Sequence, residues 1–241
     1  MLKITKNKDD LYVGIDHSVN KSAICVINGM GNIIEAALFE KSKSSHKYTF
    51  TYLGSDQKKI KEDTIKVKEQ KPTKKYNNSS SIFFLEKENE YFLSGEKNFE
   101  SEVISDGLKS GLIYDDGEYT RTALICEAIR DFLKGFSQRK LHIVIEGYAF
   151  FAPGNIVLIA ENIGYLKILL VKEYWGFEMV QPNSIKLALT GFGGGGKDSM
   201  QFALKNKYGV DFNNDDLNDA FAMAEYSRLK AMGLVKSGNV S

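Results

Sequence analysis

The hydrophobic pattern of this chain changes its period once, and that change limits the folds available to it. The first part contains three short apolar runs separated by turns, at residues 11–16, 22–28 and 33–39, which is typical of an antiparallel meander. From Tyr119 onward, apolar residues recur at helical spacing and alternate with further short strands. A meander followed by alternating helices and strands predicts an α/β fold, in which helices flank a mixed sheet.

The second part of the chain predicts a series of helices with two further strands. The helices are expected at about residues 119–133, 155–174, 182–190, 198–208 and 215–232. The strands, at residues 142–146 and 176–181, would add parallel members to the sheet. Because 241 residues suit one domain with a substantial core, residues 1–241 are interpreted as a single domain.

Residues 41–118 separate the two parts and are interpreted as an insertion, because residues 41–80 are polar and rich in lysine and serine and residues 94–117 are weakly patterned. A small hairpin is expected within them, at residues 81–85 and 90–93. From Lys58 to Lys75, eight lysines stand against three acids, although the net charge of the whole chain is only +1. This basic arm could grip phosphate groups, or it could be a solvated surface loop, and both interpretations stay open.

The cysteines and the hydropathy pattern bear on the cellular compartment. Cys25 and Cys126 are far apart and belong to no Cys-x-x-Cys pair. A disulfide framework or a structural zinc site is therefore not expected, and a reducing cytosol is the natural compartment. No apolar run has the length of a membrane span or the form of a secretory leader. The sequence predicts a cytoplasmic protein without a membrane partner.

Four carboxylates occupy positions that suggest a shared site. Asp16 and Glu146 each end an apolar strand, whereas Asp216 and Asp219 lie three residues apart on one face of an expected helix. Each alone could be a turn residue, and Asp215 or Asp216 could be a helix cap. Clustered carboxylates repel one another unless a cation neutralises them, and oxygen ligands without His or Cys suit Mg²⁺. Two such ions can activate water and stabilise the leaving oxygen of a phosphodiester.

The order of these residues resembles the RuvC family of Holliday-junction resolvases, which has an RNase H-like fold. The similar segments are Gly14-Ile-Asp16, Val144-Ile-Glu146, Pro182-x-x-x-Lys186-x-x-x-Thr190-Gly191-x-Gly193-x-x-x-Lys197 and Asp216-x-x-Asp219-Ala220-x-Ala222. They occur in the order that the family has, and they cover residues 11–39 and about 119–231. The distance of 130 positions between the first two acids is far longer than in compact resolvases, which puts substrate preference in doubt more than chemistry.

The resemblance implies a metal-dependent endonuclease of phage or bacterial type that cuts branched DNA as a homodimer. The four carboxylates would ligate two Mg²⁺ ions, for which Mn²⁺ would substitute. Lys197 would stabilise charge at the scissile phosphate, and Lys186 would hold the DNA backbone. Aromatic residues after the second acid would stack at the junction, and the candidates are Tyr148, Phe150 and Phe151. The helix expected at residues 155–174 would support the dimer.

Two phosphate-binding patterns compete with this interpretation. The run from Gly191 to Lys197 has the spacing of a P-loop, but Asp198 follows where Ser or Thr would bind magnesium, and a helix rather than a strand is expected before it. No nucleotide cofactor is therefore expected. Residues 14–18 resemble the first phosphate loop of actin and sugar kinases, but no second phosphate motif is visible. Flaps, forks and RNA–DNA hybrids stay open as substrates, and so does an inactive DNA-binding module of the same fold.

Overall fold

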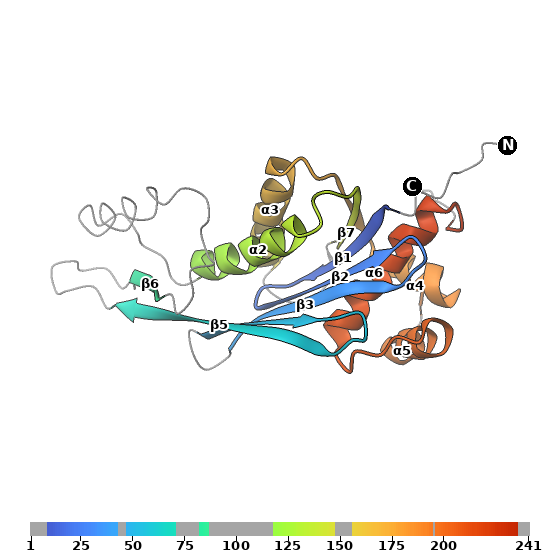
Figure 1. The fold of residues 1–241 in the computed structure, drawn as a ribbon, viewed down its shortest axis with the longest axis horizontal. Helices are drawn as coiled ribbons and strands as arrows, with labels where there is room; N and C mark the ends of the chain where they lie inside the picture. Colours follow the sequence, from blue (N-terminus) through green and yellow to red (C-terminus); the bar gives the residue numbers. More distant parts are fainter. Residues whose placement is uncertain are drawn as a thin grey trace.

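A computed structural model describes residues 9–42, 47–70, 82–86, 118–147, 156–194 and 196–235, which are built around one sheet (Figure 1). Eight strands lie in the order β6-β5-β4-β3-β2-β1-β7-β8. Their bounds are Leu11–His17 for β1, Lys21–Asn28 for β2, Ile33–Lys41 for β3, Lys47–Leu53 for β4, Lys59–Gln70 for β5, Ile82–Glu86 for β6, Leu141–Glu146 for β7 and Phe177–Val180 for β8. Neighbours from β1 to β6 are antiparallel, whereas β1, β7 and β8 are parallel to one another. The predicted α/β class is confirmed, and the mixed sheet fits an RNase H-like arrangement.

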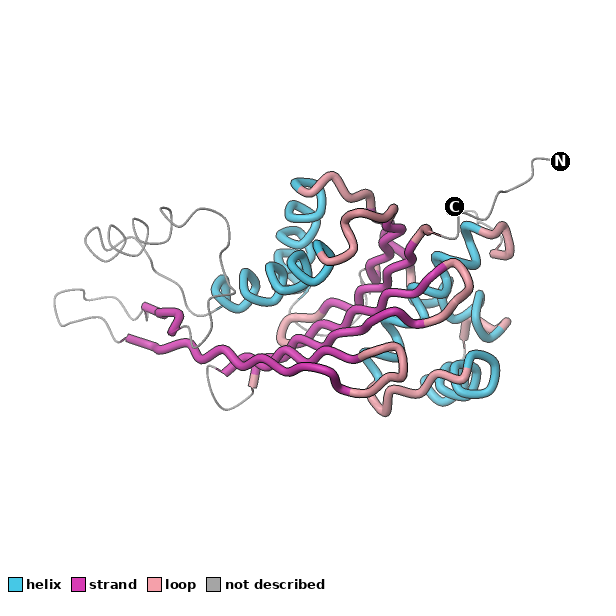
Figure 2. The backbone as a smooth tube through the Cα atoms, viewed as in Figure 1, coloured by secondary structure: helices cyan, strands magenta, loops and turns pink. Residues whose placement is uncertain are grey.

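Helices cover both faces of this sheet (Figures 1 and 2). α2 (Glu118–Lys134) and α3 (Ile156–Lys172) lie on one face. α4 (Pro182–Thr190) and α6 (Asp215–Ala231) lie on the other, with α5 (Lys197–Ala203) and the π-helical turn η1 (Leu204–Tyr208) beside them. The helices expected from the sequence are therefore present, and the one expected at residues 198–208 divides into α5 and η1.

β1 distributes its side chains between these two layers. Val13 and Ile15 belong to the core under α2 and α3, whereas Tyr12 belongs to the core under α6. Successive side chains of a strand point to opposite faces of the sheet. Asp16 therefore lies on the α6 face, and His17 lies on the face covered by α2 and α3.

The segment after β3 continues the sheet, so residues 59–70 of the basic arm form strand β5 rather than a loop, whereas residues 71–75 lie outside the described residues. β4 and most of β5 pair in an antiparallel ladder whose register shifts between Tyr52 and Leu53, and Tyr48 and Phe50 are buried in the core under α2. Apolar residues alternate with polar ones in β4, so one face can pack while the other stays polar. In β5 the many lysines make the same alternation hard to recognise in the sequence. One of them, Lys59, forms an ion pair with Glu62 of the same strand.

The expected hairpin at residues 81–85 and 90–93 is described only in its first half. Its first half is β6, which pairs with the distal end of β5 at residues 66–70. Its second half lies outside the described residues, as do residues 71–81 and 87–117. The interpretation of residues 41–118 as an insertion stays a prediction.

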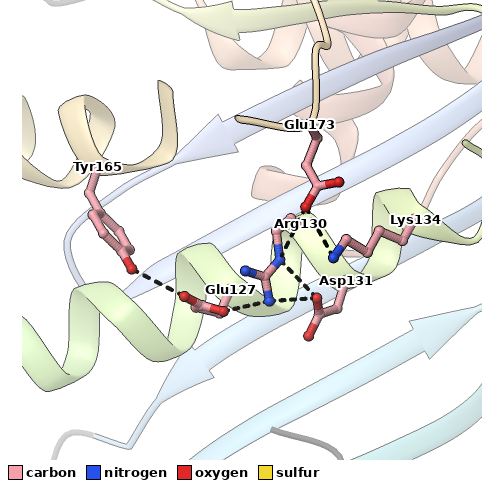
Figure 3. Close-up of polar contacts among 6 residues, drawn as sticks. All are labelled: Glu127, Arg130, Asp131, Lys134, Tyr165 and Glu173. Atoms are coloured by element: carbon pink, nitrogen blue, oxygen red, sulfur yellow. Dashed lines mark hydrogen bonds and ion pairs between the residues drawn. The ribbon is translucent and has the colours of Figure 1, made fainter. Parts of the chain in front are cut away.

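A network of charged side chains joins α2 to α3 on the side away from α6 (Figure 3). Arg130 lies 2.5 Å from Glu127 and 2.8 Å from Asp131, and its Nε atom is 4.0 Å from Glu173, which follows α3. Tyr165 of α3 donates a hydrogen bond of 3.1 Å to Glu127. Only 16% of the Arg130 side chain is exposed, so these ion pairs are less screened than ordinary surface pairs. The network holds together the two helices that support the rear of β1.

His17, at the end of β1, is buried among polar groups from other elements. Its Nδ1 atom lies 2.5 Å from Ser22 Oγ, and its Nε2 atom lies 3.6 Å from the sulfur of Cys126 on α2. Burial lowers the pKa of His17 to about 4. The ring is therefore neutral at ordinary pH, and it links the end of β1 to β2 and α2.

This buried ring is expected to make the fold sensitive to acid. Between pH 6.5 and about 4 the unfolded chain binds a proton at His17 that the folded chain does not bind, so stability falls as the pH falls through this window. The loss attributable to this group is about 3 kcal/mol. Urea unfolding at pH 7 and pH 4 should show a smaller loss for His17→Gln than for the wild type. Equal losses of unfolding free energy in the two proteins would show that protonation of His17 does not destabilise the fold.

Candidate active site

The carboxyl ends of β1 and β7 bring the first two predicted acids together. β1 and β7 are parallel neighbours, and their ladder extends to the pair Ile15 and Ile145. The next residues are Asp16 and Glu146, which share the α6 face because strand side chains alternate. Neighbouring strands lie about 5 Å apart, so the backbones of these two residues, both half-buried, lie next to each other at one end of the sheet.

A close contact at Gly14 sets the position of α6 over this edge. A Cβ atom at Gly14 would lie 2.0 Å from the Ala220 carbonyl oxygen and 2.6 Å from the Ala224 nitrogen, so the helix backbone rests directly on β1. Ser227, further along α6, donates a hydrogen bond of 3.4 Å to the carbonyl of His142, which pairs with Tyr12 near the start of β1, so α6 runs antiparallel to β1. The first turns of α6, which precede Ala220, must therefore extend toward the end of β1 that carries Asp16.

The acids of α6 lie in these first turns. Asn214 is the N-cap, and its side chain accepts a hydrogen bond of 3.0 Å from the Leu217 backbone nitrogen. The alternative interpretation of Asp215 or Asp216 as the cap is therefore wrong. Asp216 is half-buried and Asp219 is exposed, and the helix N-terminus favours negative charge at Asp216, which lies in the first turn.

A cavity of about 210 Å³ lies beside this edge, between β7, α4, α5 and α6. Glu146, Asp215, Asp219 and Lys186 are among its lining residues. Desolvation raises the pKa of Glu146, the charge of Asp219 raises it further, and the charge of Lys186 opposes them. These three groups therefore act on one another. Asp16 is not among the lining residues of the cavity.

A lysine that was not among the predicted site residues lies beside Asp216 of α6. Lys21, at the start of β2, places its Nζ atom 2.5 Å from Asp216 Oδ2 and 3.1 Å from Glu40 Oε1. Asp215 was also missed, and its Oδ1 accepts a hydrogen bond of 2.8 Å from Gln201. The sequence signal for Lys21 was its place directly after the turn that follows Asp16, but nothing in the sequence pairs it with α6.

Of the other predicted site residues, the structure describes the side chain of Lys186 only. Lys186 of α4 faces the carboxylate cavity, so its expected contact with the DNA backbone would occur at this site. Lys197 begins α5, and its side chain lies outside what the structure describes. The aromatic candidates Tyr148, Phe150 and Phe151 also lie outside the described residues. Their expected roles stay predictions.

The Thr190-Gly191 motif has a structural role at the end of α4. Gly191 caps the helix with a left-handed backbone at φ 79°, a conformation that favours glycine. The Thr190 hydroxyl donates a hydrogen bond of 2.7 Å to the Lys186 carbonyl and accepts one from the Phe192 nitrogen at 3.1 Å. Because a helix precedes the glycines, as expected, the segment lacks the strand that a P-loop requires.

The chemistry of this acidic set fits a hard divalent cation. Glu146 and Asp219 offer oxygen ligands whose mutual repulsion a cation would relieve. In the part of the chain that the structure describes, however, no three His, Cys, Asp or Glu side chains lie close enough together to hold a metal ion. Lys21 provides the positive charge beside Asp216 instead. Mg²⁺ or Mn²⁺ at this edge is therefore a proposal based on the donor set.

Comparison with known proteins leaves the family of this chain open. No family model matches the sequence. Among solved structures, RuvC from Thermus thermophilus is similar, with a TM-score of 0.49 and 14% identity over 93% of this chain and 97% of that chain. T. thermophilus RuvC in complex with a Holliday junction substrate has a TM-score of 0.48 and 14% identity over 93% and 96% of the two chains. Likeness at this level identifies neither activity nor ligand. No helix in the described ranges has the length and apolar character needed to cross a membrane.

Proposed function

We propose that this chain is a metal-dependent endonuclease that cuts branched DNA, with four-way junctions as the preferred substrate. The observation that supports this proposal best is the arrangement of the acids. Asp16 and Glu146 end adjacent parallel strands, and the turns of α6 that carry Asp216 and Asp219 extend over the same edge. Ligands of α/β sheets bind at the carboxyl ends of strands, and an all-oxygen set there suits phosphodiester chemistry.

Each of the site residues would have a role that follows from its position. Asp16, Glu146, Asp216 and Asp219 would hold two divalent ions, which when bound would activate water and stabilise the leaving oxygen. Lys186 lies in the cavity with Glu146, where its ammonium group can bind a phosphate oxygen as a point charge. Lys197 would add a second positive charge from the start of α5. The cavity itself would admit the backbone of one strand beside the acids.

The choice of branched DNA rests on the resemblance of the four motifs to the RuvC family, and the cytosolic location rests on the two separated cysteines. Purified protein with Mg²⁺ should cut a synthetic four-way junction faster than a linear duplex, a flap or an RNA–DNA hybrid of the same sequence. Faster cutting of the flap or the hybrid would support nuclease activity but would show that the preferred substrate is not a four-way junction. Binding without cleavage of any substrate, with Mg²⁺ or with Mn²⁺, would favour an inactive DNA-binding module.

A homodimer through α3 is part of this proposal. Val157, Gly164, Ile168 and Val171 fall on one helical face by their spacing, together with Glu161. Val157, Ile168 and Val171 are 65%, 54% and 62% exposed, and the surface beside Gly164 is open. Exposed apolar residues aligned along one helix are typical of a partner surface.

Charge on this face is therefore expected to separate the subunits. The double variant Ile168→Glu and Val171→Glu should raise the dimer dissociation constant by more than about a hundredfold, because it would bury unpaired charges. Light scattering during size-exclusion chromatography measures this change. Met30→Glu is the matched control, because Met30 is 70% exposed in the turn between β2 and β3. A monomeric wild type would contradict the dimer.

A further inference from the structure

Lys21 is surrounded by acids at the edge where the proposed metals would bind. It stands opposite Glu40 in the pairing of β2 with β3, and its ammonium group contacts both Glu40 and Asp216. Asp16 pairs with Ala23 across β1 and β2, so Lys21, two residues before Ala23, is its diagonal neighbour on the same face. Diagonal neighbours lie about 7–8 Å apart, which is within reach of a lysine side chain.

Cation chemistry makes Lys21 and a metal ion alternatives at Asp216. A carboxylate oxygen that lies 2.5 Å from an ammonium nitrogen cannot also be fully available as a ligand to a divalent ion. An ion that binds Asp216 would be repelled by the ammonium group at the same time. The side chains of Lys21 and Asp216 are 33% and 34% exposed, so the lysine has room to move away while Glu40 continues to hold it.

We propose that Lys21 is a resident counter-cation, which occupies Asp216 in the metal-free protein and is displaced toward Glu40 when a divalent ion binds. Lys21 thereby positions the first turn of α6 over the end of β2 before the metal arrives, and it lowers the affinity of the site for the ion. The inference rests on the proposed function in one respect, since it takes Asp216 as a metal ligand.

The test measures Mn²⁺ binding to the full-length protein by calorimetry, without DNA. Lys21→Met removes the charge and keeps the length of the side chain, so it should bind Mn²⁺ at least about fivefold more tightly than the wild type. Lys21→Arg keeps the charge and should bind like the wild type. Lys59→Met is the matched control, because it removes an ion-paired lysine on β5, three strands away from β2 in the sheet, and it should also bind like the wild type.

A second measurement needs no variant and applies if Lys21→Met fails to fold. Acetylation of the wild-type lysines, followed by mass spectrometry, should label Lys21 faster when Mn²⁺ is added, whereas labelling of Lys59 should not change. Mn²⁺ affinity in folded Lys21→Met that equals or falls below that of the wild type would overturn the inference. Lys21 labelling that is insensitive to bound Mn²⁺ would also overturn it. A wild type that binds no divalent ion would instead overturn the proposed nuclease, and this inference with it.

Discussion

Replacement of any one of Asp16, Glu146, Asp216 and Asp219 by the matching amide is expected to abolish cleavage while the protein still binds DNA. Loss of a partner behind a metal ligand typically lowers activity or metal affinity by about 10–100-fold, so the loss of a ligand itself should exceed that range. Affinity for DNA should be unchanged or higher, because each substitution removes a negative charge that repels phosphate. Cleavage of a labelled junction and fluorescence anisotropy with the same junction measure the two effects.

Asp56→Asn is the control for these four variants. Asp56 lies in the turn between β4 and β5, where its side chain accepts a hydrogen bond from the Lys58 nitrogen, and asparagine can accept the same bond. Its cleavage rate should match that of the wild type. Cleavage retained in all four single variants would place the metal site elsewhere in the chain. Loss of both cleavage and binding would indicate a folding defect, which circular dichroism would reveal.

The second large effect is expected at Gly14, where substitution should disrupt both folding and the site. The added methyl group of Gly14→Ala would meet the Ala220 carbonyl oxygen at 2.0 Å, and neither backbone can yield without separating α6 from β1. Overpacking of a core typically costs about 1–3 kcal/mol, and a clash between two backbones should lie at or above the upper end. Urea denaturation would show a shift of the midpoint with little change of slope.

Gly176→Ala is the matched substitution, because a Cβ atom there meets nothing within 4 Å. It should leave stability within about 1 kcal/mol of the wild type. Any Gly14→Ala protein that stays folded should also cut DNA poorly, since α6 carries two of the four acids. A folded Gly14→Ala with normal stability would show that α6 does not rest on β1 as described.

The sequence predicted the elements whose hydrophobic period is unambiguous. The buried strands β1 and β7 and the helix α6 were expected close to their observed bounds, and the acids that follow from them, Asp16 and Glu146, were placed at strand ends. β4 and β5 were not expected, because lysine and threonine at alternate positions make a half-buried strand resemble a polar loop. Tertiary pairing with β3 decides the structure there, and local composition does not reveal it.

The parts of the site that the sequence did not reveal depend on contacts between distant segments. The ion pair of Lys21 with Asp216 joins residues 195 positions apart, and only the docking of α6 brings them together. Gly14 belongs to the Gly14-Ile-Asp16 motif, but nothing in that motif indicates that a helix backbone lies against the glycine. Asp215 lines the cavity beside Glu146, and its neighbour Asp216 had been chosen because it matched the motif.

The seating of α6 on β1 has a consequence for the safety of the cell that makes this protein. A ribosome synthesises Asp16 long before Asp219, so a growing chain would hold the first acids of the proposed nuclease without the last two. Such a chain, and any fragment that has lost α6 to a protease, is expected to leave DNA intact. A chain stopped after residue 214 should show no cleavage when a wild-type sample cuts the junction completely. Cutting by that fragment would mean that α6 is dispensable for the chemistry.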